Sequence, residues 1–384
     1  MTQLQPHFSP GALSGIKVID ASRVLGGPLC GQILADHGAD VLKVESPDGD
    51  DTRKWGPPFK DGMSAYFSGL NRNKSVVVVD LSGDEGRDQL MALLEDADVL
   101  IENFKPSTLA EWGISPEKLQ ERFPRLVHCR VSGFGPDGPL GGLPAYDTAV
   151  QGMTGLMSVN GDASTGPLRV GLPVVDMTTA LNATIGVLLA LQERQRSGRG
   201  QLVETTLYDN GLSLLHPHAA NYFMTSRVPV ATGNAHPNIY PYDAFETRTR
   251  AVYLAVGNDV QYRKLCAVLD EPSLAADARF ATAASRSENR SSLKPLLAGL
   301  FADKEGCSFA EQLLAAGVPA SAIVGVDSAL SHPHTEHRGM VVSIGESYRG
   351  LGSPIALSRT PATYRTAPPA LPTTKQPDEL SANH

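Results

Sequence analysis

Short apolar runs alternate with helix-like segments over residues 16–132. The runs are Ile16–Ile19, Val41–Val44, Val76–Val79, Val99–Ile101 and Leu126–Val131. This alternation is typical of a parallel sheet covered by helices. Because Val76–Val79 consists entirely of valine, both faces of that strand are apolar, as expected of a strand that is buried on both sides. The pattern predicts a large α/β domain with a Rossmann-like parallel sheet.

The second half of the chain changes its pattern. Its helical stretches are 176–194, 208–225, 262–269 and 309–316, and its strand-like runs are 201–206, 251–256 and 320–326. The turn Ser197–Gly200 separates the first of these helices from the first strand. We expect a large domain at 1–205, a linker helix and loop at 206–239, and a smaller α/β domain at 240–330.

The composition is that of an ordinary globular protein. Of the 384 residues, 41% are hydrophobic and 19% are charged, and the formal net charge is −8. No long basic run is present, so neither a nucleic acid nor a membrane surface is an expected partner. The first fifteen residues lack the basic start and apolar stretch of a secretory signal, and no uninterrupted apolar segment is long enough to span a bilayer. We therefore expect a cytoplasmic protein.

Two groups of residues bear on metal binding. The four cysteines are far apart and form no Cys-x-x-Cys pair, which suits a reducing compartment and argues against structural zinc. His332, His334 and His337 form a cluster, but their spacing is irregular and no His-Glu-x-x-His motif accompanies them. We expect no metal site. The tail from Ala367 onward is rich in Pro, Thr and Ala, which is compatible either with disorder or with a segment that wraps over a partner.

A glycine-containing turn follows the first strand. Its sequence, Arg23–Pro28, does not match the Gly-x-Gly-x-x-Gly fingerprint of dinucleotide-binding turns, so a nicotinamide or flavin cofactor is not expected. The turn can still offer backbone N–H groups to an anion, because Pro28 suits the first turn of a following helix. A plain strand-to-helix turn is equally compatible with these residues.

Asp176 lies between an apolar run and a helix of small and aliphatic residues. This position is at or beside a helix N-cap, where unpaired N–H groups and the helix dipole should keep the carboxylate ionised at neutral pH. An ionised carboxylate can attack a thioester carbonyl. Most aspartates at such positions only cap their helix, so the residue type alone favours a capping role.

Several motifs resemble, in order and spacing, those of the class III CoA-transferases. This is the CaiB/BaiF family, which includes formyl-CoA transferase. The motifs are Ile19–Pro28, Gly38–Glu45, Gly49–Arg53, Asn71–Ser75, Glu102–Pro106 and Gly198–Gln201. The resemblance runs across nearly the whole chain. Within the family, the stretches Arg23–Pro28, Asp51–Phe59 and His218–Tyr222 most resemble succinate–hydroxymethylglutarate transferases.

The resemblance implies a role for particular residues. It makes Asp176 the covalent nucleophile of a CoA transfer, with coenzyme A as a substrate and with no tightly bound cofactor. The implied CoA-binding residues are Val24, Leu25, Gly26, Arg72, Val79, Leu81, Asn103, Phe104, Lys105 and Tyr146, and the implied acyl-binding residues are Asn234 and His236. A Pro-ordered turn with a surface histidine would explain His236 equally well. The resemblance also implies an interlocked homodimer whose large domain is completed by residues 331–384.

Two departures and two alternatives remain. Formyl-CoA transferase has a lysine where this chain has Pro144, and its acid after the tyrosine is shortened here to Asp147. These changes leave the formyl and oxalate pairing open, and we expect succinyl-CoA and a short dicarboxylate instead. An α-methylacyl-CoA racemase would have a histidine where this chain has Tyr146. A catalytically inactive CoA-binding scaffold is the second alternative.

Overall fold

The computed structural model describes residues 11–372, which form two compact units. The large unit consists of residues 11–156, 170–216 and 336–372, and the small unit consists of 157–169 and 217–335. The small unit therefore also takes in residues 157–169 and 217–239, which lie outside the range expected from the sequence pattern.

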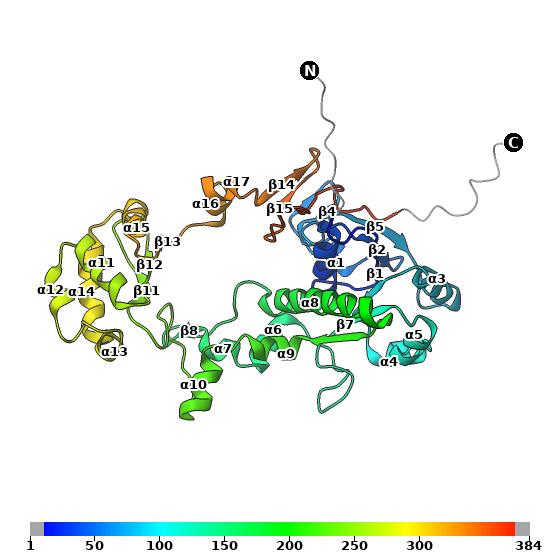
Figure 1. The fold of residues 1–384 in the computed structure, drawn as a ribbon, viewed down its shortest axis with the longest axis horizontal. Coiled ribbons are helices and arrows are strands. Elements are labelled where there is room, and N and C mark those ends of the chain that lie inside the picture. The colour runs from blue at the N-terminus through cyan, green and yellow to red at the C-terminus, as the bar shows by residue number, and fades with distance from the viewer. Residues whose placement is uncertain (1–10, 373–384) are drawn as a thin grey trace, which may run out of the picture. The chain divides into compact units, whose positions relative to one another are not determined.

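A six-stranded sheet forms the centre of the large unit (Figure 1). Its strands, in spatial order, are β10 (Leu202–Thr206), β7 (Val127–Ser132), β6 (Val99–Glu102), β1 (Lys17–Asp20), β2 (Asp40–Glu45) and β5 (Lys74–Val78). All five neighbouring pairs are parallel. In chain order this arrangement reads 6-5-4-1-2-3, which is the Rossmann strand order, so the predicted parallel sheet is confirmed.

Helices cover both faces of this sheet. Because successive strand residues point to opposite faces, neighbouring residues of one strand belong to different cores. Val18 and Ile101 belong to the core shared with helices α1 (Gly26–Asp36) and α8 (Val174–Ser197). Their neighbours Ile19 and Leu100 belong to a second core on the other face, with helices α3 (Asp84–Leu94), α4 (Pro106–Glu111) and α5 (Pro116–Arg122). The central strands are therefore buried on both sides.

Shorter elements complete the large unit. They are η1 (Asp51–Lys54), β3 (Phe59–Lys60), β4 (Met63–Ser64), α2 (Ala65–Ser68), α6 (Asp147–Met153), α9 (Leu207–Ser213), β14 (Val341–Ile344) and β15 (Tyr348–Leu351). The pairs β3–β4 and β14–β15 are antiparallel two-stranded ribbons that the apolar pattern did not predict. Helices α7 (Leu156–Val159) and α17 (Pro333–His337) lie at the boundaries of the two units.

The C-terminal segment packs against the rest of the large unit. The N–H of Thr363 donates to the carbonyl of Asp36 at 2.8 Å, and the N–H of Asn73 donates to the carbonyl of Thr366 at 2.9 Å. The guanidinium of Arg53 donates to the carbonyl of Pro369 at 3.1 Å. Residues 363–369 are thus hydrogen-bonded to elements near the beginning of the chain. The last part of the tail, 373–384, lies outside the described residues.

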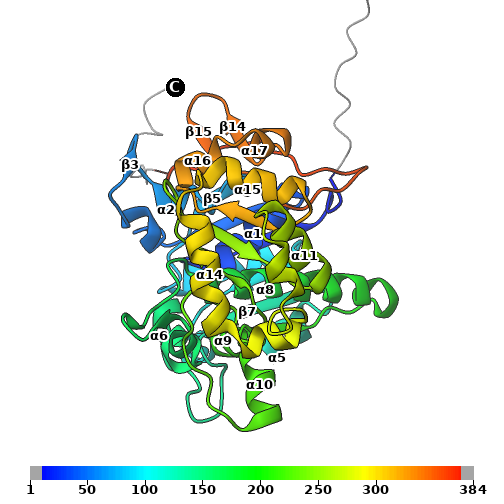
Figure 2. The same cartoon turned by 90° about the vertical axis from the view of Figure 1, so that its left-hand side faces the viewer.

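The small unit contains an antiparallel sheet of β11 (Tyr242–Phe245), β12 (Val252–Ala255) and β13 (Ala320–Ala322). Its helices are α10 (His218–Thr225), α11 (Asp259–Val268), α12 (Pro272–Ala276), α13 (Ala283–Glu288), α14 (Arg290–Ala302), α15 (Gly306–Ala315) and α16 (Val326–Leu330), and it also holds the ribbon of β8 (Gly161–Asp162) and β9 (Gly166–Pro167). Figure 2 shows α11, α14 and α15. These helices and the sheet share one apolar core that includes Phe245, Leu265, Leu297 and Leu313.

Helix α8 is the longest apolar helix among the described residues. Its 24 residues are long and apolar enough to cross a membrane by length and composition alone. One side of the helix, including Val175, Ala183 and Val187, is fully buried in the core of the large unit. A core helix of a globular domain passes the same test, so α8 is weak evidence for a membrane span.

Candidate functional site

A cavity of about 610 Å³ lies at the carboxyl ends of the parallel strands. Its lining comes from the loops that follow β1, β2, β5, β6, β7 and β10. In this sheet the chain runs from β1 outward to β2 on one side and returns to β6 on the other. Ligands of open α/β sheets bind at such a switch point, outside the carboxyl ends of the strands. The position of the cavity is therefore set by the topology.

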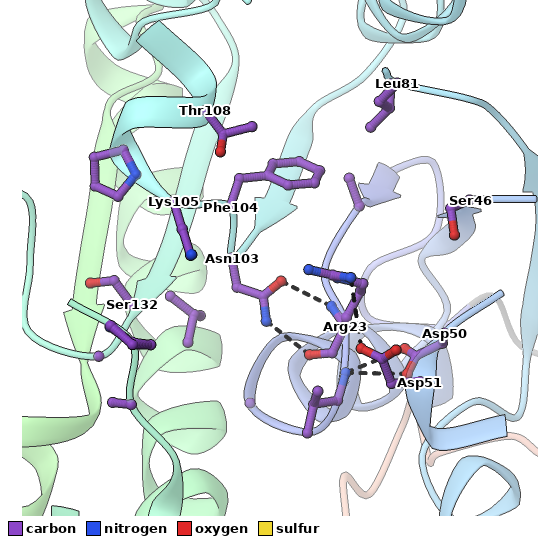
Figure 3. Close-up of a pocket in the computed structure, with 18 of the residues that line it drawn as sticks. Arg23, Ser46, Asp50, Asp51, Leu81, Asn103, Phe104, Lys105, Thr108 and Ser132 are labelled. Carbon is purple, nitrogen blue, oxygen red and sulfur yellow. Dashed lines mark hydrogen bonds and ion pairs between the residues drawn. The ribbon is translucent and has the colours of Figure 1, made fainter. Parts of the chain in front are cut away.

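The loops after β1 and β6 are joined directly across the switch point. The side-chain amide of Asn103 donates to the carbonyl of Arg23 at 2.8 Å, and its oxygen accepts from the N–H of Arg23 at 3.0 Å (Figure 3). The next residue, Val24, has a φ of 72°. A positive φ in a β-branched residue is an outlier that persists only where the surroundings enforce it.

A buried ion pair helps to enforce it. The Asp50 carboxylate accepts from the N–H of Val24 at 3.3 Å and lies 3.1 Å from the ammonium of Lys43. Both charged side chains are 0% exposed, and Lys43 also donates to the carbonyl of Ser22 at 2.8 Å. Burial alone would raise the pKa of Asp50, but the Lys43 charge and hydrogen bonds from Thr52 outweigh it and lower the pKa. Asp50 is therefore a charged anchor beneath the turn.

Asp176 lines the same cavity from the first turn of α8. The helix N-cap is Pro173, which has no side-chain acceptor. The N–H groups of Val175 and Asp176 instead donate to the carboxylate of Asp147, at 2.8 and 3.1 Å. Asp147 thus takes the capping role that the sequence alone favoured for Asp176.

The protonation of Asp176 also differs from the sequence-based expectation. Burial, together with the negative charge of Asp147, raises the pKa of Asp176 to about 7. Two of the helix N–H groups that were expected to stabilise this carboxylate donate to Asp147 instead. Near neutral pH the carboxyl group is therefore about half protonated in the free chain, whereas full ionisation was expected.

Most of the predicted CoA-binding residues come together in this cavity. The lining includes Val24, Leu25, Gly26, Val79, Leu81, Asn103, Phe104, Lys105 and Tyr146. The Phe104 ring packs edge-on against Trp112, with ring centroids 5.2 Å apart. The Phe104 N–H donates to the buried Glu102 at 2.9 Å, which holds this part of the wall in place. Tyr146 is 64% exposed at the rim.

Arg72 is not part of the cavity lining. Its guanidinium forms an ion pair with Asp36 at 2.6 Å and is almost completely buried. It also donates to the hydroxyl of Tyr348 and to the carbonyl of Leu351. These contacts join α1 to the β14–β15 ribbon, so the structure gives Arg72 a place between packed elements, away from the other predicted CoA-binding residues.

Asn234 and His236 belong to the small unit. Nδ1 of His236 accepts from the N–H groups of Asn238 and Ile239, at 3.1 and 3.2 Å, and its ring packs against Tyr242. Burial, with the charges of Arg290 and His218, lowers the pKa of His236, so the ring is neutral at physiological pH. The carbonyl of Asn234 accepts from the hydroxyl of Tyr253 at 2.8 Å. Both residues lie in an ordered turn.

Within residues 11–372, no group of three or more His, Cys, Asp or Glu side chains could hold a metal ion. The cluster of His332, His334 and His337 lies on or beside the short helix α17 and does not form such a group.

Sequence reasoning missed several residues around the cavity. Arg23, Asp50 and Asp51 all line it, and Arg23 lies 3.7 Å from Asp51. Tyr66 on α2 does not line the cavity, but it lies close enough to the site that burial and the charges of Asp176 and Asp147 raise its pKa to about 12. The position of Arg23 in the loop after β1 was the one usable signal, since loops after parallel strands form the site in such sheets.

Comparison with known proteins agrees with this geometry. The family model for CoA-transferase family III matches residues 13–373. A succinate–glutarate CoA-transferase of Agrobacterium fabrum is 38% identical, covering 97% of this chain and 95% of that protein. A succinyl-CoA:mesaconate CoA-transferase of Haloarcula hispanica is 36% identical, covering 91% of each chain. The crystal structure of a CaiB/BaiF family protein from Brucella suis is 38% identical, with a TM-score of 0.84 and coverage of 94% of this chain and 97% of that chain. The chain therefore belongs to CoA-transferase family III and is a CoA-transferase.

Proposed function

We propose that the chain moves coenzyme A from succinyl-CoA to a short carboxylic or dicarboxylic acid, with Asp176 as the covalent nucleophile. The observation that carries the proposal is the free carboxylate of Asp176. It lines the cavity at the switch point and is relieved of capping by Asp147. Relatives whose names specify succinate or succinyl-CoA, such as those of Agrobacterium fabrum and Haloarcula hispanica, support the donor.

The first half-reaction forms a bond to Asp176. One oxygen of its carboxylate attacks the thioester carbonyl of succinyl-CoA, the carbon–sulfur bond breaks, and CoA leaves as a thiolate. The product is a mixed anhydride between Asp176 and succinate. The thiolate then attacks the aspartyl carbonyl carbon and expels succinate, which leaves CoA bound to Asp176 as a thioester.

The second half-reaction reverses these steps with the acceptor acid. Its carboxylate attacks the aspartyl thioester and releases the thiolate, which then attacks the acceptor's carbonyl carbon and frees the Asp176 carboxylate. Each step exchanges one activated acyl bond for another, so neither ATP nor a metal is required.

The start of α1 lies beside Asp176 and suits the developing negative charge. A Cβ atom on Gly26 would lie 3.9 Å from the Asp176 carbonyl oxygen and 3.3 Å from Val131, so the backbones approach closely at this point. The N-cap of α1 is Leu25, which provides no side-chain acceptor for the first N–H groups. We propose that these N–H groups stabilise the oxyanion of each tetrahedral intermediate.

Other residues are proposed to bind CoA and the acyl group. We propose that Lys105 binds a phosphate of CoA as a flexible cation at the cavity wall. Val24, Leu25 and Gly26 with Val79, Leu81, Asn103, Phe104 and Tyr146 then contact the remainder of the CoA molecule. For Arg72 the burial and the ion pair with Asp36 favour a structural role. Asn234 and His236 remain proposed contacts of the acyl group.

An exposed apolar face on α8 supports the proposed homodimer. Its exposed residues are Met177, Leu181, Ile185, Leu188 and Leu189, with exposed fractions from 41% to 65%. Such a stripe along one side of a helix in the large unit is typical of a surface that another protein covers. We propose that a second copy of the chain covers it, in the interlocked arrangement that the family resemblance implies. Light scattering of the wild type should give twice the mass of the monomer. The variant Leu189→Glu should give a lower mass, because a charge on this face would weaken the dimer.

The composition remains the basis for the proposed compartment. Dispersed cysteines and the lack of any long basic run suit the reducing cytoplasm.

Isotope transfer is the sharpest test of the covalent route. The enzyme is incubated with succinyl-CoA and an ¹⁸O-labelled acceptor acid such as glutarate. Because the acceptor leaves one oxygen on Asp176, label should appear in the aspartyl residue and, in later turnovers, in released succinate. Hydroxylamine added with succinyl-CoA should modify the Asp176 peptide, as detected by mass spectrometry.

A matched pair of variants tests whether Asp176, unlike another acid near the start of a helix, is the nucleophile. Asp176→Asn should reduce CoA transfer by about a thousandfold or more, because the residual amide is not a nucleophile. Asp209→Asn is the control, since Asp209 is an exposed acid at the equivalent position of helix α9 and does not line the cavity. Exchange of the substrate α-proton in deuterated water without any CoA transfer would instead indicate racemase-type chemistry. An unmodified Asp176 peptide and no transfer would indicate a binding scaffold.

A further inference from the structure

Helix α8 begins without a cap of its own. Its N-cap, Pro173, has no side-chain acceptor, and Asp176 is the third residue of the helix. The first N–H groups of a helix lack intrahelical partners, and a buried N–H without a partner destabilises the fold. An acceptor from elsewhere in the chain is therefore needed at this point.

Asp147 supplies that acceptor from another helix. A single carboxylate oxygen, Oδ2, accepts from the N–H of Val175 at 2.8 Å and from that of Asp176 at 3.1 Å. The second bond is to the main chain of the proposed nucleophile itself. Asp147 is only 7% exposed, so water competes little for this carboxylate.

The carboxylate of Asp147 is itself held in place. Its other oxygen, Oδ1, accepts from the side-chain amide of Gln151 at 2.5 Å. The amide oxygen of Gln151 accepts from the N–H of Val170 at 2.8 Å, and Gln151 is fully buried. Helix α6, the segment that leads into α8 and the first turn of α8 are thereby joined in one hydrogen-bonded unit.

The charge of Asp147 also acts on the nucleophile. After burial, it is the second cause of the raised pKa of Asp176. The titratable groups that act on one another here come from three further places: Asp147 on α6, Tyr66 on α2 and Asp50 before η1. Tyr66 packs edge-on against Trp55, with ring centroids 5.1 Å apart. Asp147 is the group in direct contact with the main chain of Asp176.

We propose that Asp147 is a positioning residue for Asp176: its buried carboxylate replaces the missing N-cap of α8, fixes the main chain at the nucleophile and leaves the nucleophile's own carboxylate free to react. This inference rests on the proposed function, because it assigns Asp147 to the same CoA-transfer reaction.

Two substitutions separate the hydrogen bonds of Asp147 from its charge. Asp147→Asn keeps an oxygen that can accept from the two N–H groups but removes the negative charge and the acceptor for the Gln151 amide. At pH 8.5 its kcat should stay within about threefold of the wild type, and the acidic limb of its pH–rate profile should move down by about one pH unit. Asp147→Ala loses both functions. Its kcat should fall on the order of 10- to 100-fold, with KM for succinyl-CoA within about twofold, because the nucleophile is displaced while the CoA pocket remains.

Ser115→Ala is the matched control for a lost cap. Ser115 caps α5 in the same unit by accepting from the N–H of Lys118, and it does not line the cavity. This variant should lose thermal stability as Asp147→Ala does, yet retain the wild-type kcat and pH profile. If Asp147→Ala also retains the wild-type kcat, or if the pH–rate limb of Asp147→Asn coincides with that of the wild type, Asp147 does not position the nucleophile.

An activity-independent measurement keeps the two proposals distinguishable. The ¹³C-carboxyl resonance of Asp176, assigned by its loss in Asp176→Asn, is titrated in the wild type and in Asp147→Asn. A lower midpoint in the variant supports the proposed contact even if the wild type transfers no CoA, in which case only the proposed function fails. Equal midpoints would overturn the role of Asp147 even in an active transferase.

Discussion

Replacing Asp50 by alanine should destabilise the large unit strongly, because it leaves a buried ammonium without its partner. Lys43 and Asp50 are both 0% exposed, and their charged atoms lie 3.1 Å apart. The substitution also removes the acceptor for the N–H groups of Val24 and Thr52. Both the fold and the strained turn at the cavity depend on this carboxylate.

The size of the effect follows from the distance and the burial. At 3.1 Å and an effective dielectric constant of about 20, two unit charges attract each other by about 5 kcal/mol. Removing one partner of a buried pair typically costs about 3–5 kcal/mol. Lys43 keeps its hydrogen bond to the carbonyl of Ser22 at 2.8 Å, and, against the effect of burial, it helps Lys74 to lower the pKa of Asp20. We therefore expect a loss near the lower end, about 3 kcal/mol.

Tryptophan fluorescence during urea unfolding can measure this loss in the large unit alone. The chain has two tryptophans, Trp55 and Trp112, and both belong to that unit. Asp51→Ala is the neighbouring control. Its carboxylate pairs with Arg23 at 3.7 Å with more than half of each side chain exposed, so the expected cost is below about 1 kcal/mol.

The double variant Lys43→Met/Asp50→Ala tests the cause. If an unpaired buried charge is the main penalty, removing both partners should recover at least about half of the loss. The pKa of Asp50 is lower in the folded state than in the unfolded state. Its contribution to the free energy of unfolding is therefore complete at any pH above the ordinary pKa of an aspartate, and it is lost only as the pH falls through the folded-state pKa. The loss in Asp50→Ala should therefore be equal at pH 6 and pH 8. A double variant no more stable than Asp50→Ala would refute this explanation.

Three further predictions concern the site. Because the pKa of Asp176 is about 7 and only the ionised form attacks, kcat/KM should rise with pH through a midpoint near 7, and at pH 6 it should be roughly a tenth of its maximum; a flat profile between pH 5 and 8 would contradict this. An acid whose folded-state pKa is raised destabilises the fold increasingly as the pH rises from its unfolded-state value to its folded-state value. Asp176→Asn should therefore raise the free energy of unfolding by about 2–4 kcal/mol at pH 8.5 and leave it unchanged at pH 3, as measured by urea unfolding at each pH. Arg72→Met should lower the thermal unfolding temperature without changing KM for succinyl-CoA, whereas Lys105→Met should raise that KM without lowering the unfolding temperature. If Arg72 bound CoA, steady-state kinetics would instead show a raised KM for Arg72→Met.

The centre of the large sheet could be predicted from the sequence because its central strands, such as β6 and β7, are almost completely buried, whereas the edge strands β5 and β10 are partly exposed. Every one of its strands coincides within about two residues with an apolar or strand-like run, and the short length of these runs favours strands over helices. The ribbons β3–β4 and β14–β15 lacked such a signal, since each strand has at most four residues and is held mainly by its partner. Short pairings of this kind depend on tertiary contacts.

The site was predictable where the residues adjoin strand ends and was not where distant residues meet. Asn103 and Phe104 follow a strand directly, and the topology brings them to the cavity. The partner of Arg72 is Asp36 on α1, and the acceptor at the start of α8 is Asp147 on α6. Neither pairing has a fixed sequence spacing. Arg72 was therefore predicted to bind CoA, whereas in the structure its guanidinium pairs with the carboxylate of Asp36.

The late contacts of residues 363–369 impose an order on biosynthesis. All six strands of the large sheet have left the ribosome once Thr206 has emerged. The hydrogen bonds of the Asn73 N–H and the Asp36 carbonyl can form only later, when Thr366 and Thr363 have also emerged. During that interval the nascent large unit exposes polar groups that the finished protein pairs, while residues 217–335 of the small unit are being translated. Completion of the first-made domain is therefore a post-translational or very late cotranslational event.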